Sequence, residues 1–60
     1  MKDMQIHLEK LRTEAAEAAL IRDLATDKAK KELFTRLTEH LQMLAGEVER
    51  AIQAAAATRS

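Results

Sequence analysis

The stretch LATDKAKKELF, residues Leu24–Phe34, decides the fold because it interrupts an otherwise continuous helical pattern. Within it, Thr26 and Asp27 are residue types favoured at helix N-caps, where a side-chain oxygen accepts a hydrogen bond from a free backbone N–H. We expect Asp27 to be the cap, since its charge also suits the positive end of a helix. The stretch predicts a turn at 25–27 between helices over about 3–24 and about 28–56. One continuous helix is the alternative, because neither glycine nor proline enforces a stop.

Apolar residues recur at steps of three and four on both sides of this turn, which is the spacing of one helix face. A short connection makes the two helices antiparallel neighbours, and it predicts that Ala18 meets Phe34 and that Leu8 meets Leu44. The lone Gly46 lies inside the second stripe, where it is either a close-packing point or a mild weakness. The predicted seam comprises Met4, Leu8, Leu11, Ala15, Ala18, Phe34, Leu37, Leu41, Leu44, Val48 and Ile52.

The composition favours an all-α fold and excludes several classes of function. The 60 residues include twelve alanines, one glycine and no proline, and no segment alternates with the period of a strand. Cysteine is absent, so disulfides and thiolate metal sites are excluded. Ten basic residues balance ten acidic ones, which gives no general attraction to nucleic acid or anionic membrane. With neither a signal-peptide pattern nor a transmembrane stretch, we expect a soluble, cytoplasmic protein.

Two helices cannot enclose a core, so the sequence predicts association with a partner. A chain of 60 residues is also marginally stable by itself. We expect a homodimer of hairpins that forms a four-helix bundle, with a higher oligomer, a monomer or a hetero-complex as alternatives. Apolar residues outside the seam mark a possible second interface, namely Ile6, Leu20, Leu24 and Met43.

The segment DKAKKELFTRLTEHLQML, Asp27–Leu44, resembles the turn that opens a ligand helix in ferritin-like half-bundle hairpins. The resemblance implies the hairpin shape, and it places the family's ligand glutamate at Leu41 and its ligand histidine at Leu44. Both positions are apolar here, so no metal ligand and no cofactor is expected. The two histidines, His7 and His40, lie too far apart in the predicted register to share a metal ion.

The sequence contains no arrangement of residues typical of an active site, so we expect no enzyme. It has no cysteine nucleophile and no glycine-rich phosphate loop, and its carboxylates fall mostly on outward helix faces. Basic residues do gather around the turn, where a helix N-terminus already favours anions. This cluster, a candidate anion-binding or nucleic-acid-binding site and otherwise a solvated turn, comprises Arg22, Lys28, Lys30 and Lys31.

The longer run RDLATDKAKKELFTRLTEHLQMLAGEVERAI, Arg22–Ile52, is similar to a group of short alphaproteobacterial proteins that are stand-alone helical hairpins. This resemblance implies no activity and transfers no site residues. The leading hypothesis is a non-catalytic module for self-association or protein interaction. An anion- or nucleic-acid-binding accessory factor is the second hypothesis, and a degenerate ferritin-like metal protein is the third.

Overall fold

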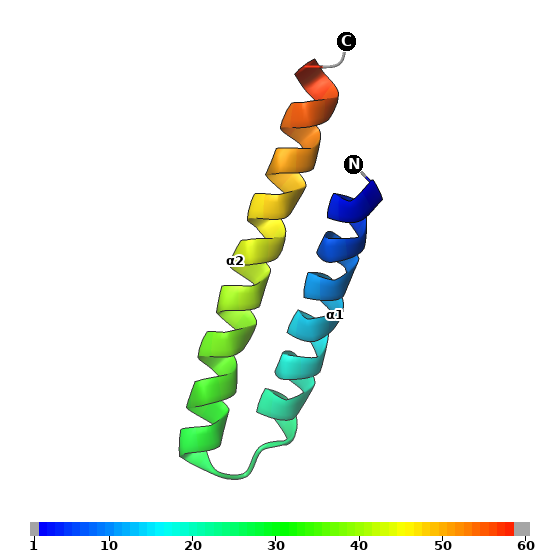
Figure 1. Cartoon of the computed structure of the whole chain (residues 1–60). Coiled ribbons are helices and arrows are strands. Elements are labelled where there is room, and N and C mark those ends of the chain that lie inside the picture. Colours follow the sequence, from blue (N-terminus) through cyan, green and yellow to red (C-terminus); the bar gives the residue numbers. More distant parts are fainter. Residues whose placement is uncertain (1, 59–60) are drawn as a thin grey trace.

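The computed structural model describes residues 2–58 and shows two helices joined by a short turn. Helix α1 spans Lys2–Leu24 and helix α2 spans Lys28–Thr58, and the two run antiparallel side by side (Figure 1). No strand occurs in this part of the chain. The predicted helical hairpin is confirmed, and α2 extends two residues further than the sequence indicated.

The turn forms where Asp27 caps α2. The backbone N–H of Ala29 donates to Oδ1 of Asp27 at 3.4 Å, and the N–H of Lys31 donates to the carbonyl of Asp27 at 2.9 Å. The last turn of α1 closes with a bond of 2.9 Å from the N–H of Ala25 to the carbonyl of Ile21. The predicted cap is therefore confirmed, and the single continuous helix is excluded.

The buried positions between the helices are mostly small side chains, namely Ala15, Ala18, Thr38 and Ala45, beside Leu8 and Leu41. The centre of the seam contains Ala15, Ala18 and Leu41, with Leu11 and Phe34 packed against them. Of the predicted seam, the buried residues are Leu8, Ala15, Ala18 and Leu41, and the half-buried ones are Met4, Leu11, Phe34, Leu44, Val48 and Ile52. Leu37 is exposed, because α1 does not extend over its side of α2.

Thr38 is the most buried residue of the described chain, with 1% of its surface exposed. It is not among the seam residues that the sequence predicts. Its hydroxyl donates to the carbonyl of Phe34 at 2.7 Å, one turn earlier in the same helix. The polar atom is thus satisfied without a partner on α1, and the remaining small side chain lets the helices approach closely.

The seam contacts are displaced along α2 relative to the predicted register. An ion pair joins Arg12 to Glu49, whereas the predicted register placed residue 40 level with residue 12. Side chains in a helix lean toward its N-terminus, so those of two antiparallel helices lean in opposite directions. A side chain of α1 in the seam therefore contacts an α2 residue that lies further from the turn than the α2 residue whose Cα atom is directly opposite.

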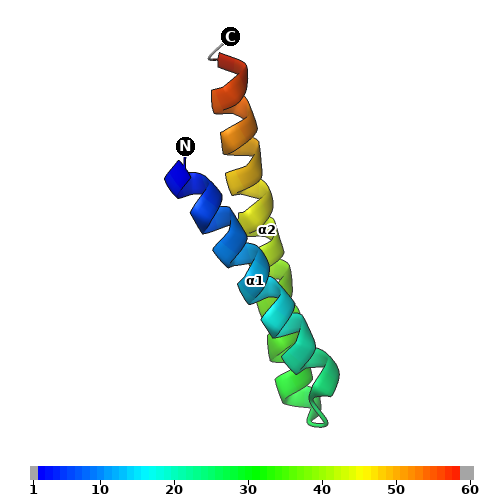
Figure 2. The ribbon, with the colours of Figure 1, turned by 90° about the vertical axis from the view of Figure 1, so that its right-hand side faces the viewer.

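The hairpin is a layer only one helix thick. Its Cα extents are 50 × 14 × 11 Å, and Figure 2 shows the helices crossing at a shallow angle with the N-terminal end of α1 turned away from α2. Within residues 2–58, neither helix has an apolar stretch of the length needed to cross a bilayer. Both broad faces of the layer are therefore open surfaces of the chain.

Candidate association surface

Nearly half of the large apolar side chains in the described chain are exposed. Only two leucines, Leu8 and Leu41, are buried in the described chain, while seven large apolar residues have between 38% and 72% of their surface exposed. These seven are Ile6, Leu20, Ile21, Leu24, Leu33, Leu37 and Met43. The exposed share is large, because a monomeric core buries its large apolar residues preferentially.

Several of these residues gather on one broad face of the hairpin. Ile21 and Leu37 border a shallow groove between the helices that is also lined by Ala18, Phe34 and Leu41 and, along α1, by the acidic Glu14 and Glu17. Along α2, the helical period places the exposed Leu33 and the half-buried Leu44 and Val48 on the same side as Leu37. We call this row the leucine face; its members are Leu33, Leu37, Leu44 and Val48.

The predicted second interface does not form one surface. Ile6, Leu20 and Leu24 are exposed on the outer side of α1, and about 21 Å of helix separates Ile6 from Leu20 at 1.5 Å per residue. Met43 is exposed on α2, with Glu39 and Glu47 one turn away on either side. Leu20 and Leu24 lie one turn apart and adjoin each other, whereas Ile6 and Met43 are separate apolar positions.

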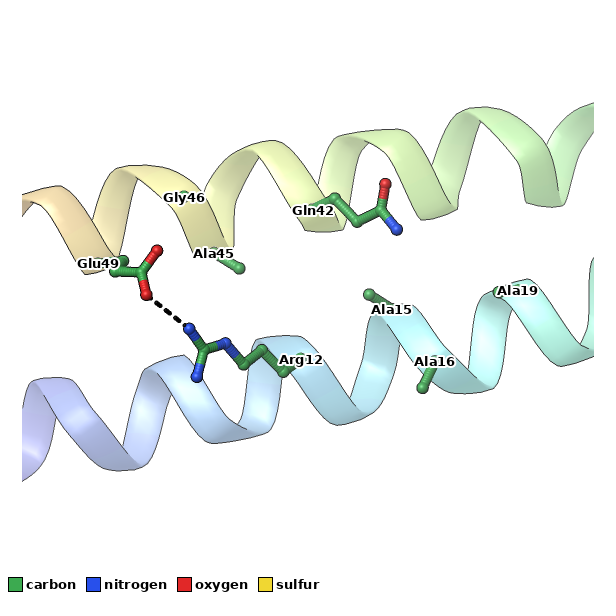
Figure 3. A pocket seen from close by; sticks show the side chains of 8 residues that line it. All are labelled: Arg12, Ala15, Ala16, Ala19, Gln42, Ala45, Gly46 and Glu49. Carbon is green, nitrogen blue, oxygen red and sulfur yellow. Dashed lines mark hydrogen bonds and ion pairs between the residues drawn. The ribbon is translucent and has the colours of Figure 1, made fainter.

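A second groove lies on the opposite face, and it is lined by small residues. Figure 3 shows Arg12 reaching from α1 to Glu49 at one end, with the side chain of Gln42 further along α2. The rest of the lining is Ala15, Ala16, Ala19, Ala45 and Gly46. A methyl group added at Gly46 would meet only the end of the Arg50 side chain, at 3.5 Å. Gly46 is therefore not a close-packing point.

The basic residues around the turn do not converge on one point. Lys28 and Lys31 border a shallow hollow on α2 together with Arg36, but Lys30 is two residues from Lys28 and so lies on another side of the helix. The Nε atom of Arg22 contacts Oδ1 of the adjacent Asp23 at 3.0 Å. The hollow also contains a carboxylate, that of Glu32, which opposes anion binding there.

The two histidines do not belong to a metal-binding arrangement. His7 in α1 and His40 in α2 are both exposed. Among residues 2–58, no three histidine, aspartate or glutamate side chains are grouped so that they could hold a metal ion. His40 instead lies at the border of the leucine face, three residues after Leu37.

The geometry of the hairpin is all that bears on its function. Comparison of the chain with protein-family models, with curated proteins and with solved structures gave no match. Neither the ferritin-like resemblance nor the alphaproteobacterial one gains support from these comparisons, and both stay predictions.

Proposed function

We propose that the protein is a non-catalytic self-association module, in which two hairpins combine into a four-helix bundle. The observation that carries this proposal is the distribution of side-chain sizes. Four of the six buried residues in the described chain are alanines or a threonine, while seven leucine, isoleucine and methionine side chains are exposed on a layer one helix thick. A second layer would supply the cover that α1 does not give to α2.

The size of the solvent-exposed area of the hairpin supports the same proposal. A compact monomer of this mass, 6.7 kDa, exposes about 3,900 Å² according to the usual scaling of area with mass. The hairpin exposes 4691 Å², which is an excess of about 800 Å² over that scaling. A protein–protein interface of standard size removes about 800 Å² from each partner. One such interface would therefore bring the exposed area of each chain to that of a compact protein.

Sedimentation equilibrium over a wide range of concentration tests the proposal. Interference optics are needed, because the chain has no tryptophan and no tyrosine to absorb at 280 nm. We expect twice the chain mass of 6.7 kDa and a melting temperature that rises with concentration. A helical species that keeps the mass of one chain up to millimolar concentration would contradict the proposal.

A second candidate function is anion binding at the start of α2. The observation that favours it is the shared hollow of Lys28, Lys31 and Arg36. If it binds a nucleic-acid backbone, affinity falls steeply as salt rises, because bound counterions are released from the phosphates. Fluorescence anisotropy with a labelled RNA or DNA duplex, started at low salt, measures this affinity. The matched control is the double variant Lys28→Gln and Lys31→Gln, which lacks both lysine charges of the hollow.

The cytoplasmic location expected from the sequence belongs to this proposal as well. Cell fractionation followed by mass spectrometry checks it, with recovery in the soluble fraction as the expected result.

A further inference from the structure

We propose that the second copy packs on the leucine face, with α2 antiparallel to α2 of the other copy and a two-fold axis passing between residues 40 and 41. This inference rests on the proposed function and specifies its interface. The two turns then lie at opposite ends of the bundle, and α1 lies beside α1 of the other copy.

The leucine face has the internal symmetry that such an interface requires. In a two-fold interface the same surface patch occurs on both copies, so residue i meets residue j and residue j meets residue i. Leu33 and Val48 are equally distant from the midpoint between 40 and 41, and so are Leu37 and Leu44. Antiparallel packing about that midpoint pairs Leu37 with Leu44 and Leu33 with Val48, twice each.

Charges along the outer border of α2 complement each other under the same operation. Arg36 follows Leu33 by three residues and Glu47 follows Leu44 by three, so both border the leucine face on its outer side. Two-fold rotation brings Arg36 near Glu47 of the other copy. Within the described chain, the ion pairs involve other side chains, which leaves these two groups available to a partner.

The border on α1 matches as well. Because Ala15 packs with Leu41 in the seam, the proposed axis is level with about residues 13–15 of α1. Lys10 and Glu17 are equally distant from the midpoint of residues 13 and 14, so the rotation brings Lys10 near Glu17 of the other copy. The same rotation brings Glu14, which also lines this side of the hairpin, near its own counterpart, so one repulsive pair stands beside the two attractive ones. The Lys10–Glu17 pairing on α1 is thus compatible, to within about two residues, with the axis that the apolar pairing on α2 defines.

The other surfaces of the hairpin fit a second copy less well. The opposite groove is crossed by the Arg12–Glu49 ion pair and is lined otherwise by alanines, Gly46 and Gln42, so covering it removes little apolar area. On the outer side of α1, polar Thr13 lies between the distant Ile6 and Leu20.

Cysteine cross-linking tests the arrangement, because the chain has no cysteine of its own. Chains carrying Leu37→Cys are mixed with nitrogen-15-labelled chains carrying Leu44→Cys, equilibrated under reducing conditions and then oxidised. A disulfide requires Cα atoms within about 7 Å. We expect intact-mass measurement to show the mixed 37–44 disulfide as the main product. The matched control is a chain carrying Met43→Cys on the outer side of α2, which should give a much lower yield of disulfide.

The outcomes separate this inference from the proposed function. Predominant 37–37 and 44–44 disulfides would indicate parallel packing of α2, and absence of any disulfide in a chain that sediments as a dimer would place the interface elsewhere. Both results overturn the inference and leave self-association intact. A chain that sediments as a monomer overturns both proposals.

Surface substitutions give a second measurement that does not depend on a disulfide. Leu37→Glu should raise the dimer dissociation constant at least about 100-fold, because each dimer buries two unpaired charges. The matched change Leu20→Glu, on the outer side of α1, should alter it less than about 3-fold. Equal effects of the two substitutions would contradict the assignment of the interface to the leucine face.

Discussion

Arg12 in α1 and Glu49 in α2, 37 residues apart in the chain, are joined by a contact of 2.8 Å between Nη2 and Oε2. Glu9 lies on the other side of the same guanidinium, 3.8 Å from Nη1. About half of each side chain in the Arg12–Glu49 pair stays exposed. The contact therefore aligns the two helices more than it stabilises them, since exposed ion pairs contribute little free energy.

Reversing this pair gives the first prediction. We expect Arg12→Glu alone to destabilise the hairpin, because two carboxylates then face each other, and Arg12→Glu combined with Glu49→Arg to restore most of the loss. The coupling free energy should be about 0.2–1 kcal/mol, and it should shrink as salt is added. Chemical denaturation of the four proteins of the double-mutant cycle measures it. A coupling that is unchanged by salt would argue against the solvent-exposed pair described here.

Gly46→Ala should stabilise the protein by about 0.5–1 kcal/mol, because glycine is unfavourable inside a helix. The added methyl group has space, since its nearest neighbour is the end of the flexible Arg50 side chain at 3.5 Å. Thermal melting followed by circular dichroism checks the sign. The control is the adjacent buried position, where Ala45→Gly should lower stability.

Asp27→Ala removes the cap of α2 and should cost about 0.5–1 kcal/mol, the lower part of the usual range, because the capping bond is long at 3.4 Å. Asp27→Asn keeps an acceptor oxygen and should cost less. The melting temperatures of these two variants, compared with that of Thr26→Ala, give the measurement. If Thr26→Ala has the larger effect, Thr26 and not Asp27 is the residue that caps α2.

Thr38→Leu should destabilise the hairpin by about 1–3 kcal/mol, because the added volume has no space between the helices where Thr38 is 1% exposed. Thr38→Val keeps the shape and removes a hydroxyl that bonds only within its own helix, so its effect should be smaller. Denaturant titration of both variants separates packing from hydrogen bonding. A larger loss for the valine variant would show that the hydroxyl matters more than the volume.

His40→Leu should strengthen self-association, since it extends the apolar row at the proposed two-fold axis, where each His40 lies close to its counterpart. His40→Lys should weaken it by placing like charges near one another. The dissociation constants of the two variants, measured by sedimentation, should move in opposite directions from that of the unmodified protein. Movement in the same direction would exclude His40 from the interface.

The turn and the hairpin could be predicted because they depend on local chemistry. Asp27 has the side chain that a helix start requires, and the apolar steps on either side have the helical period. The sequence could not show which neighbouring residues of α2 are most deeply buried against α1, because the apolar residues of α2 cover more than one helix stripe. Leu37 and Thr38 are neighbours in the chain, and the leucine has the stronger apolar character, yet the threonine is the buried one.

The reason lies in α1, whose central seam positions are alanines. Ala15 and Ala18 allow α2 to come close, and close approach favours a small residue such as Thr38 over a bulky one. This choice depends on both helices together, so the pattern of α2 alone cannot reveal it. The candidate surface follows from the same selection, because Leu33 and Leu37, the two exposed leucines of α2 in the described chain, both belong to the leucine face.

The alanine seam also determines how sharply the protein melts. Small side chains bury little area, and the hairpin keeps about half of the surface of its extended chain exposed, taking about 9,700 Å² for the latter. Little surface is then newly hydrated when a single hairpin unfolds, so its heat-capacity change and its denaturant slope are both small. We therefore expect a lone hairpin to lose its structure gradually, so that a steep transition in calorimetry would support the proposed assembly.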